Sequence, residues 1–158
     1  MIYKFFSLIF LTFSINAHEL NLHMTLSPAG SFDAKTSKLR GDVIKKDNTY
    51  TSESLWVKIE DLKTENDLRN DHFWKHLGFD KNPKIVFNKI TASNGAGTGQ
   101  MTINNTTLPM NFTYKELGNK KLEANFTLKN SDFKLKEANY VLISVEDVIT
   151  GKVILDVK

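Results

Sequence analysis

The chain has 158 residues, of which 41% are hydrophobic and 25% are charged, with a formal net charge of +3. This balance excludes a disordered or fibrous chain and predicts one globular domain that is large enough for an apolar core. The lysines are scattered among acidic residues, so the sequence lacks the basic stripe of a nucleic-acid-binding protein. The chain contains no cysteine, which excludes disulfides and a lipoprotein attachment site.

Residues 1–17 combine an early positive charge at Lys4, an apolar run from Phe5 to Ile15 and a small residue at Ala17. This is the layout of a secretory signal peptide, and the apolar run is short for a membrane span. We therefore predict a signal peptide over residues 1–17, a mature domain over residues 18–158 and a periplasmic or secreted location. An uncleaved membrane anchor is the alternative.

The mature chain begins with alternating apolar and polar residues, which predict strands with one apolar face. Residues 18–26 form the first such strand and residues 39–44 the next. Gly41 lies inside this second strand, where a glycine often marks a bend or a bulge. Asp47 and Asn48 then turn the chain.

Residues 55–60 alternate again, and the pattern then changes to that of a short helix. Thr64 is the predicted N-cap and Gly78 the predicted C-cap. Pro83 bars further helix, and residues 84–92 resume as a strand. The spacing predicts an apolar helix face formed by Leu68, His72, Phe73, His76 and Leu77, and a polar face formed by Arg69, Asn70, Asp71 and Lys75.

The rest of the chain reads as a series of hairpins. Strands are predicted over residues 100–103, 108–114, 122–128, 140–147 and 152–157, with turns at residues 93–97, 104–107, 118–119, 130–133 and 150–151. Pro109 cannot donate a ladder hydrogen bond, so we expect it at a strand start or at an unpaired position. Gly95, Gly97 and Gly99 do not form a phosphate-binding loop, because a strand and not a helix follows them.

About eight to ten short strands with one apolar face each can bury those faces in two ways. They can stack as two sheets, or one sheet can close into a barrel, which also removes exposed strand edges. Periodicity alone leaves both architectures open.

Several short motifs follow one another in a characteristic order. They are L-K-T at residues 62–64, L-R-x-D-H at residues 68–72, Pro83 with Ile85 and Phe87, G-Q-M-T-I at residues 99–103, L-P-M at residues 108–110 and N-S-D-F at residues 130–133. In order and spacing these motifs resemble the YceI-like family of secreted lipid-binding proteins. The resemblance covers nearly the whole mature chain. It departs from the family pattern at Asn82, at Asn104-Asn105 and at Lys134.

The resemblance implies an all-β fold, an extended antiparallel lipocalin-like barrel of about eight strands with one short helix. It also implies a long-chain isoprenoid or fatty acyl amphiphile held inside. Composition alone favours a barrel whose core is filled by side chains. The resemblance instead favours a barrel that holds a ligand. The residues expected to contact the ligand are mainly inward-facing and apolar: Leu22, Met24, Val57, Ile59, Arg69, His72, Phe73, Ile85, Phe87, Met101, Met110, Phe112 and Phe126.

Arg69 and His72 are the polar members of this set. A guanidinium near the mouth of a barrel can bind the oxygen atoms of a lipid head group. The alternative is structural: Arg69 and Asp71 tie the helix to a neighbouring strand through an ion pair. Trp56 and Trp74 are predicted to pack.

Other chemistry finds little support in the sequence. His72 and His76 have the spacing of two metal ligands, but the glutamate of a metalloprotease motif is missing between them, so we predict no metal and no cofactor. No Gly-x-Ser-x-Gly elbow is present, and Glu60-Asp61 and Glu146-Asp147 are neighbours in predicted strands that point to opposite faces.

The leading hypothesis is a periplasmic lipid-binding barrel that transports, stores or sequesters a long apolar molecule, with transient membrane contact. A second hypothesis is a barrel with a filled core that binds another envelope protein or its own twin as a homodimer. A third and weakest is an enzyme that acts on lipid or quinone precursors.

Overall fold

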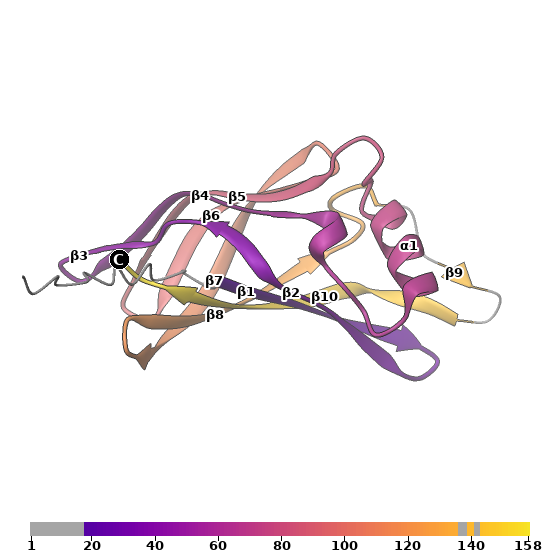
Figure 1. Cartoon of the computed structure of the whole chain (residues 1–158), viewed down its shortest axis with the longest axis horizontal. Coiled ribbons are helices and arrows are strands. Elements are labelled where there is room, and N and C mark those ends of the chain that lie inside the picture. The colour runs from indigo at the N-terminus through magenta and orange to yellow at the C-terminus, as the bar shows by residue number, and fades with distance from the viewer. Residues whose placement is uncertain (1–17, 136–138, 141–142) are drawn as a thin grey trace, which may run out of the picture.

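The computed structural model describes residues 18–135, 139–140 and 143–158, so the predicted signal peptide lies outside the described residues. Within the described ranges, eight strands close into a barrel in the order β1-β2-β4-β5-β6-β7-β8-β10, and β10 pairs back onto β1 (Figure 1). All neighbouring barrel strands are antiparallel. The predicted barrel with one short helix is confirmed, and the stacked-sheet alternative is wrong.

The strands are β1 (His18–Ser27), β2 (Ser31–Gly41), β3 (Ile44–Lys46), β4 (Thr49–Lys58), β5 (Lys84–Ser93), β6 (Ala96–Ile103), β7 (Thr106–Gly118), β8 (Lys121–Lys129), β9 (Asn139–Tyr140) and β10 (Ile143–Asp156). A 3-10 turn, η1 (Ile59–Asp61), and one helix, α1 (Asp67–His76), link β4 to β5. The helix lies across one end of the barrel, which we call the helix end (Figure 1). The other end, which carries β3 and the C-terminus, is the far end.

Alternation along β1 shows how the strands bury their apolar faces. Leu20, Leu22 and Met24 are at most 3% exposed, whereas Asn21 and His23 lie on the outer side. His18 is also buried: its Nε2 donates to the carbonyl of Gly41 (2.9 Å), and its Nδ1 accepts the backbone N–H of Asp156 (3.0 Å). The first residue of β1 therefore joins the ends of both neighbouring strands.

The helix begins two residues later than its predicted cap requires. Asn66, and not Thr64, is the N-cap, because its side-chain oxygen accepts the backbone N–H of Arg69 (2.9 Å). The helix also ends one residue earlier than predicted: Leu77 is the C-cap, and the predicted cap, Gly78, follows it with a φ of +79°. A residue with this backbone angle is usually glycine, because other residues are strained there.

The predicted apolar face of the helix is wrong in part. Leu68 is 67% exposed, while Asn70, which was placed on the polar face, is 4% exposed. The buried face consists of Asn70, Phe73 and Leu77. The helix turns Asn70 inward because its Oδ1 accepts the backbone N–H of Thr64 (2.7 Å) and lies 2.9 Å from the Thr64 hydroxyl. A buried polar pairing thus sets the rotation of the helix on the barrel.

The predicted turn at residues 150–151 is also wrong, because β10 continues through it as one strand. Thr150 and Gly151 pair with Thr127 and Phe126 of β8. The reason for a glycine here is space: a Cβ atom at position 151 would lie 2.1 Å from the ring of Phe126. Similarly, Glu60-Asp61 belongs to the 3-10 turn and not to a strand.

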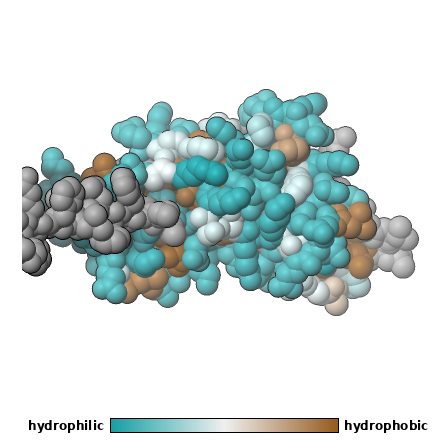
Figure 2. Space-filling view, viewed as in Figure 1, coloured by the Kyte–Doolittle hydropathy of each residue, from teal (hydrophilic) through white to brown (hydrophobic). Residues whose placement is uncertain are grey.

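The surface is mainly hydrophilic in the view of Figure 2, with small separate apolar areas. The large apolar side chains that are exposed lie on several different elements: Ile44, Leu68, Leu117, Ile143 and Val148. Among the described residues, no helix has the length and apolar character needed to cross a membrane.

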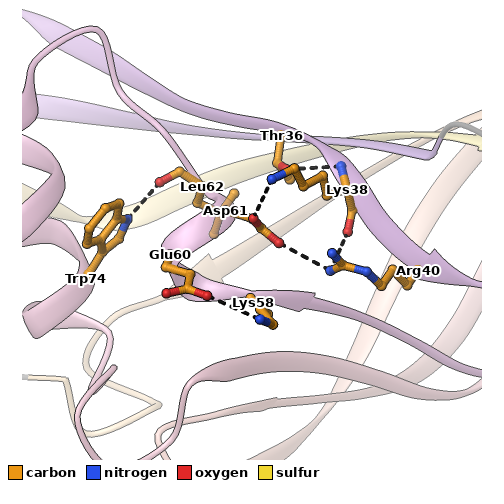
Figure 3. Close-up of polar contacts among 8 residues, drawn as sticks. All are labelled: Thr36, Lys38, Arg40, Lys58, Glu60, Asp61, Leu62 and Trp74. Carbon is orange, nitrogen blue, oxygen red and sulfur yellow. Dashed lines mark hydrogen bonds and ion pairs between the residues drawn. The ribbon is translucent and has the colours of Figure 1, made fainter.

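The junction of β2 and β4 is the shortest in the barrel wall, with pairing recorded at Arg40–Trp56 and Gly41–Leu55. The 3-10 turn continues the wall beyond these pairs. Its Asp61 carboxylate accepts hydrogen bonds from Nζ of Lys38 (3.0 Å) and from a guanidinium nitrogen of Arg40 (3.2 Å), as Figure 3 shows. Both donors come from β2, so Asp61 ties that strand to the segment that follows β4.

Acid should weaken this junction. Burial alone would raise the pKa of the Asp61 carboxyl, but the hydrogen bonds and charges of Lys38 and Arg40 outweigh it and hold the pKa below its usual value of 3.8. The carboxylate therefore stabilises the fold above that usual value, and the contribution is lost as the pH falls through the lowered pKa. We expect Asp61→Asn to cost about 1 to 2 kcal/mol at neutral pH and to flatten the loss of stability on acidification.

The measurement is the thermal midpoint of both proteins between pH 7 and pH 2. Glu60→Gln is the control. The Glu60 side chain is 46% exposed and pairs with Lys58, which is exposed to a similar extent. An Asp61→Asn curve parallel to the wild-type curve would contradict the prediction.

Candidate ligand-binding site

An apolar space lies inside the barrel towards the far end. We call it the inner cavity; its volume is about 50 Å³. It contains four of the predicted ligand contacts, Phe87, Met110, Phe112 and Phe126. The remaining lining is aliphatic or aromatic: Leu39, Val43, Tyr50, Leu55, Ile90, Ala92, Tyr114, Leu122, Ala124, Val153 and Leu155.

The inward row of β7 differs from that of its neighbour β8. On β8 every second residue from Leu122 to Leu128 is buried. On β7 the corresponding residues are only partly buried: Leu108, Met110, Phe112 and Tyr114. Large apolar side chains that face inward yet remain incompletely covered are typical of a space that is not filled by the core.

Five predicted contact residues belong to a tightly packed part of the interior: Leu22, Val57, Ile59, Ile85 and Met101 are all at most 3% exposed. The register of β1 and β10 places Leu22 opposite Gly151, between the pair Leu20–Val153 and the pair Met24–Ile149. The inward orientation predicted for these residues is confirmed. Their contact with a ligand stays a prediction.

A second apolar space lies at the helix end and is called here the helix groove. Its volume is about 200 Å³. It contains four further predicted contacts, Met24, Arg69, His72 and Phe73. The other lining residues are Leu26, Phe32, His76, Ile143, Val145 and Ile149. The groove is therefore apolar along β1 and β10 and polar along α1.

Arg69 packs against an aromatic ring in this groove. Its guanidinium carbon lies 4.8 Å from the centre of the Phe32 ring, and that ring meets Phe73 edge-on at 6.3 Å. The predicted ion pair that would tie Arg69 or Asp71 to a neighbouring strand is absent, because neither residue forms an ion pair with the described residues. The structural alternative for Arg69 is thus replaced by a cation–π contact, which leaves the charged face open to a ligand oxygen.

The two tryptophans pack as predicted. Nε1 of Trp74 donates to the carbonyl of Leu62 (2.8 Å), as Figure 3 shows, and the ammonium of Lys63 lies 4.1 Å from the centre of the ring. Trp56 lies between two cations, Arg40 at 4.8 Å and Lys84 at 4.1 Å.

Tyr50 closes the far end of the inner cavity, and sequence reasoning missed it. Its ring is 5% exposed and meets Tyr114 edge-on at 5.4 Å, while its hydroxyl donates to Glu116. That hydrogen bond and Lys45, whose Nζ lies 3.2 Å from the same carboxylate, hold the pKa of Glu116 below its usual range. The alternation of Tyr50 with the polar residues Thr49 and Thr51, directly after the predicted turn, was the signal that could have revealed it.

His72 and His76 both line the helix groove, whereas His18 and His23 lie on β1. His18 is held by backbone groups, the Nδ1 of His23 lies 2.7 Å from Asp33, and Nε2 of His76 lies 3.3 Å from Oδ1 of Asn130. In the part of the chain that the structure describes, no group of three or more histidine, aspartate or glutamate side chains has the arrangement of a metal site.

Comparison with known proteins identifies one family. The model of the YceI-like domain matches residues 11–157, which is nearly the whole chain. No curated protein sequence matches the chain significantly.

Proposed function

Because the chain belongs to the YceI-like domain family, we propose that its barrel binds a long-chain amphiphile. The apolar part of this ligand, an isoprenoid or fatty acyl chain, occupies the inner cavity. The protein acts in the periplasm or outside the cell and transports, stores or sequesters the ligand. It is a binding protein and not an enzyme.

The observation that carries this proposal is that the large inward-facing side chains of β7 beside the inner cavity are only partly buried. Met110 and Phe112 face a space whose lining is almost wholly apolar. Burial of an alkyl chain yields roughly 0.8 kcal/mol per methylene, so about ten buried methylenes supply roughly 8 kcal/mol before the costs of ordering. An apolar chain is therefore the ligand that this space favours.

The ligand must also enlarge the space. The inner cavity of about 50 Å³ and the helix groove of about 200 Å³ are both smaller than the roughly 300 to 1,000 Å³ of typical ligand pockets. Phe126 stands at the boundary, with its ring over Gly151 and edge-on to Phe87 at 5.8 Å. Rotation of this ring away from Gly151 is the smallest movement that would lengthen the cavity towards the helix end.

The filled-core interaction module remains the second candidate, because the inner cavity is small. It requires a continuous apolar patch for its partner, whereas the five exposed large apolar side chains of the described residues are distributed over four elements. The balance of these observations favours the lipid-binding function.

Native mass spectrometry of the mature protein, followed by organic extraction, tests the proposal. We expect a stoichiometric long-chain amphiphile that is lost in Phe112→Glu, because a carboxylate in the apolar cavity excludes the chain. Thr107→Glu is the control, since Thr107 is an exposed residue of the same strand and lines neither the inner cavity nor the helix groove. Protein that is free of ligand in envelope extracts and takes up no prenyl or fatty chain would favour the filled core.

A further inference from the structure

The pairing of β7 with β8 stops halfway along both strands. It runs from Phe112–Phe126 to Gly118–Lys121. Residues 106–111 of β7 pair with β6, and residues 127–129 of β8 pair with β10. Among the described residues no ladder joins these two segments to each other, and Figure 1 shows the strands diverging towards the helix end. We call this opening in the ladder the seam.

Proline helps to keep the seam open. Continuing the β7–β8 register past Phe112–Phe126 would place Pro109 opposite Lys129. Pro109 pairs with Gln100 on its β6 side and has no N–H to offer on either side. The prediction of a strand start or an unpaired position for Pro109 is met only in part, because Pro109 lies inside β7 and pairs with Gln100 but has no partner on the β8 side.

A large hollow lies on the outer surface over the seam, with a volume of about 1,040 Å³. We call it the outer hollow. Its lining carries mainly hydroxyl and amide side chains that alternate with the inward residues of six strands: Asn21, His23, Thr91, Ser93, Thr98, Asn111, Thr113, Asn125, Thr127, Thr150 and Lys152. The Oδ1 atom of Asn21 is buried and has no hydrogen-bond partner among the described residues. This acceptor lacks the partner that buried polar atoms usually have.

Two phenyl rings separate the outer hollow from the inner cavity. Phe112 and Phe126, the last pair of the β7–β8 ladder, line both spaces. Each ring lies over a glycine of the next strand: Cβ atoms at Gly97 and Gly151 would come within 2.2 Å and 2.1 Å of the respective rings. The wall here is therefore one ring thick, at the point where the ladder ends.

We propose that the seam is the lateral entrance of the barrel. The chain of the amphiphile passes between Phe112 and Phe126, while the polar end of the ligand rests in the outer hollow and is recognised by hydrogen bonds rather than by an ion pair. The pairs Phe112–Phe126 and Thr113–Asn125 part first, because they end the ladder. This inference rests on the proposed lipid-binding function and assigns its entrance to the seam instead of the helix groove.

A disulfide across the seam tests the entrance, and the chain has no cysteine of its own to interfere. Thr113 and Asn125 are directly paired outward-facing residues of β7 and β8. The double variant Thr113→Cys with Asn125→Cys, which we call the seam staple, can therefore form a disulfide at the end of the ladder. The matched control is Thr102→Cys with Thr107→Cys, a directly paired threonine pair that joins β6 to β7 and lines neither the outer hollow nor the inner cavity. Thermal unfolding verifies that both oxidised proteins are folded.

The probe is cis-parinaric acid, a fluorescent single-chain fatty acid, followed by stopped-flow mixing. We expect oxidation of the seam staple to slow both uptake and release by at least about tenfold relative to its reduced form, with little difference in Kd between the two forms, because the disulfide hinders passage and leaves the cavity intact. Reduction restores the wild-type rates, and the control staple leaves them unchanged in both states.

The outcomes separate the entrance from the function. If the probe enters and leaves the oxidised seam staple and the oxidised control at equal rates, the seam is not the entrance. Binding of the probe by both proteins would still support the lipid-binding function. Slower uptake in Arg69→Ala, with no effect of the seam staple, would move the entrance to the helix groove. A wild-type protein that binds no probe would overturn the proposed function, and the seam inference with it.

Discussion

Gly151→Ala is expected to destabilise the barrel by about 3 kcal/mol, although it adds a single methyl group. The new Cβ atom would lie between 2.1 and 2.6 Å from three carbon atoms of the Phe126 ring. Phe126 is 6% exposed and packs edge-on against Phe87, so in the ligand-free barrel a displaced ring loses packing that nothing replaces. Chemical denaturation of the two purified proteins measures the difference.

A double-mutant cycle identifies the cause. Phe126→Leu removes the atoms that the methyl group would meet, so Gly151→Ala should cost much less in that background than in the wild type. An equal cost in both backgrounds would show that the glycine is required for the backbone of β10 and not for the phenyl ring.

Asn70→Ala is expected to cost about 2 to 3 kcal/mol. The substitution leaves the backbone N–H of Thr64 without the acceptor that lies 2.7 Å away in the wild type. Thr64 and Asn70 are 8% and 4% exposed, so water cannot easily replace that acceptor. The change should also loosen α1 on the barrel, which hydrogen exchange along residues 67–76 would detect as faster exchange.

Two variants of the same helix serve as controls. Asn70→Asp keeps an Oδ1 acceptor for Thr64 and should retain more of the stability than the alanine variant, even though it gives up the amide that contacts Asp67. Asp71→Ala changes the exposed neighbour and should have little effect on stability. A cost for Asp71→Ala equal to that for Asn70→Ala would contradict the proposed pairing and point to helix propensity or charge instead.

Local patterns predicted the strands and most of the turns. Alternation placed Leu20, Leu22 and Met24 on the buried side of β1, since strand geometry alone sends every second side chain inward. The turns at Asp47 and Asn119 were also correct, and both residues have a positive φ in the structure. Short polar residues tolerate that conformation, so the signal was again local.

The errors arose where a residue outside the helix or strand decides the structure. Gly151 resembles a turn residue until Phe126 of β8 is placed over it. Asn70 resembles a surface residue until Thr64 supplies the donors for its side chain. Neither partner can be recognised from periodicity within its own element.

The candidate site, like the fold, was predictable from the sequence only in part. The inward-facing direction of residues such as Phe87 and Phe126 follows from strand alternation and the family resemblance. The division into an inner cavity and a helix groove does not, because it depends on which rings fill the space between them. The seam also escaped prediction, since the point where a ladder ends is a property of two strands and not of either sequence segment.

The pairing of the first strand with the last has a consequence for how the chain acquires its structure. Glu19 of β1 is the partner of Ile154 of β10, so the barrel cannot close until almost the whole chain is present. Contacts between residues so far apart in sequence make folding slow compared with that of small helical proteins. Until β10 arrives, β1 and β8 both carry a free edge that other chains can join. The interval before closure is therefore the period in which this protein most needs a chaperone.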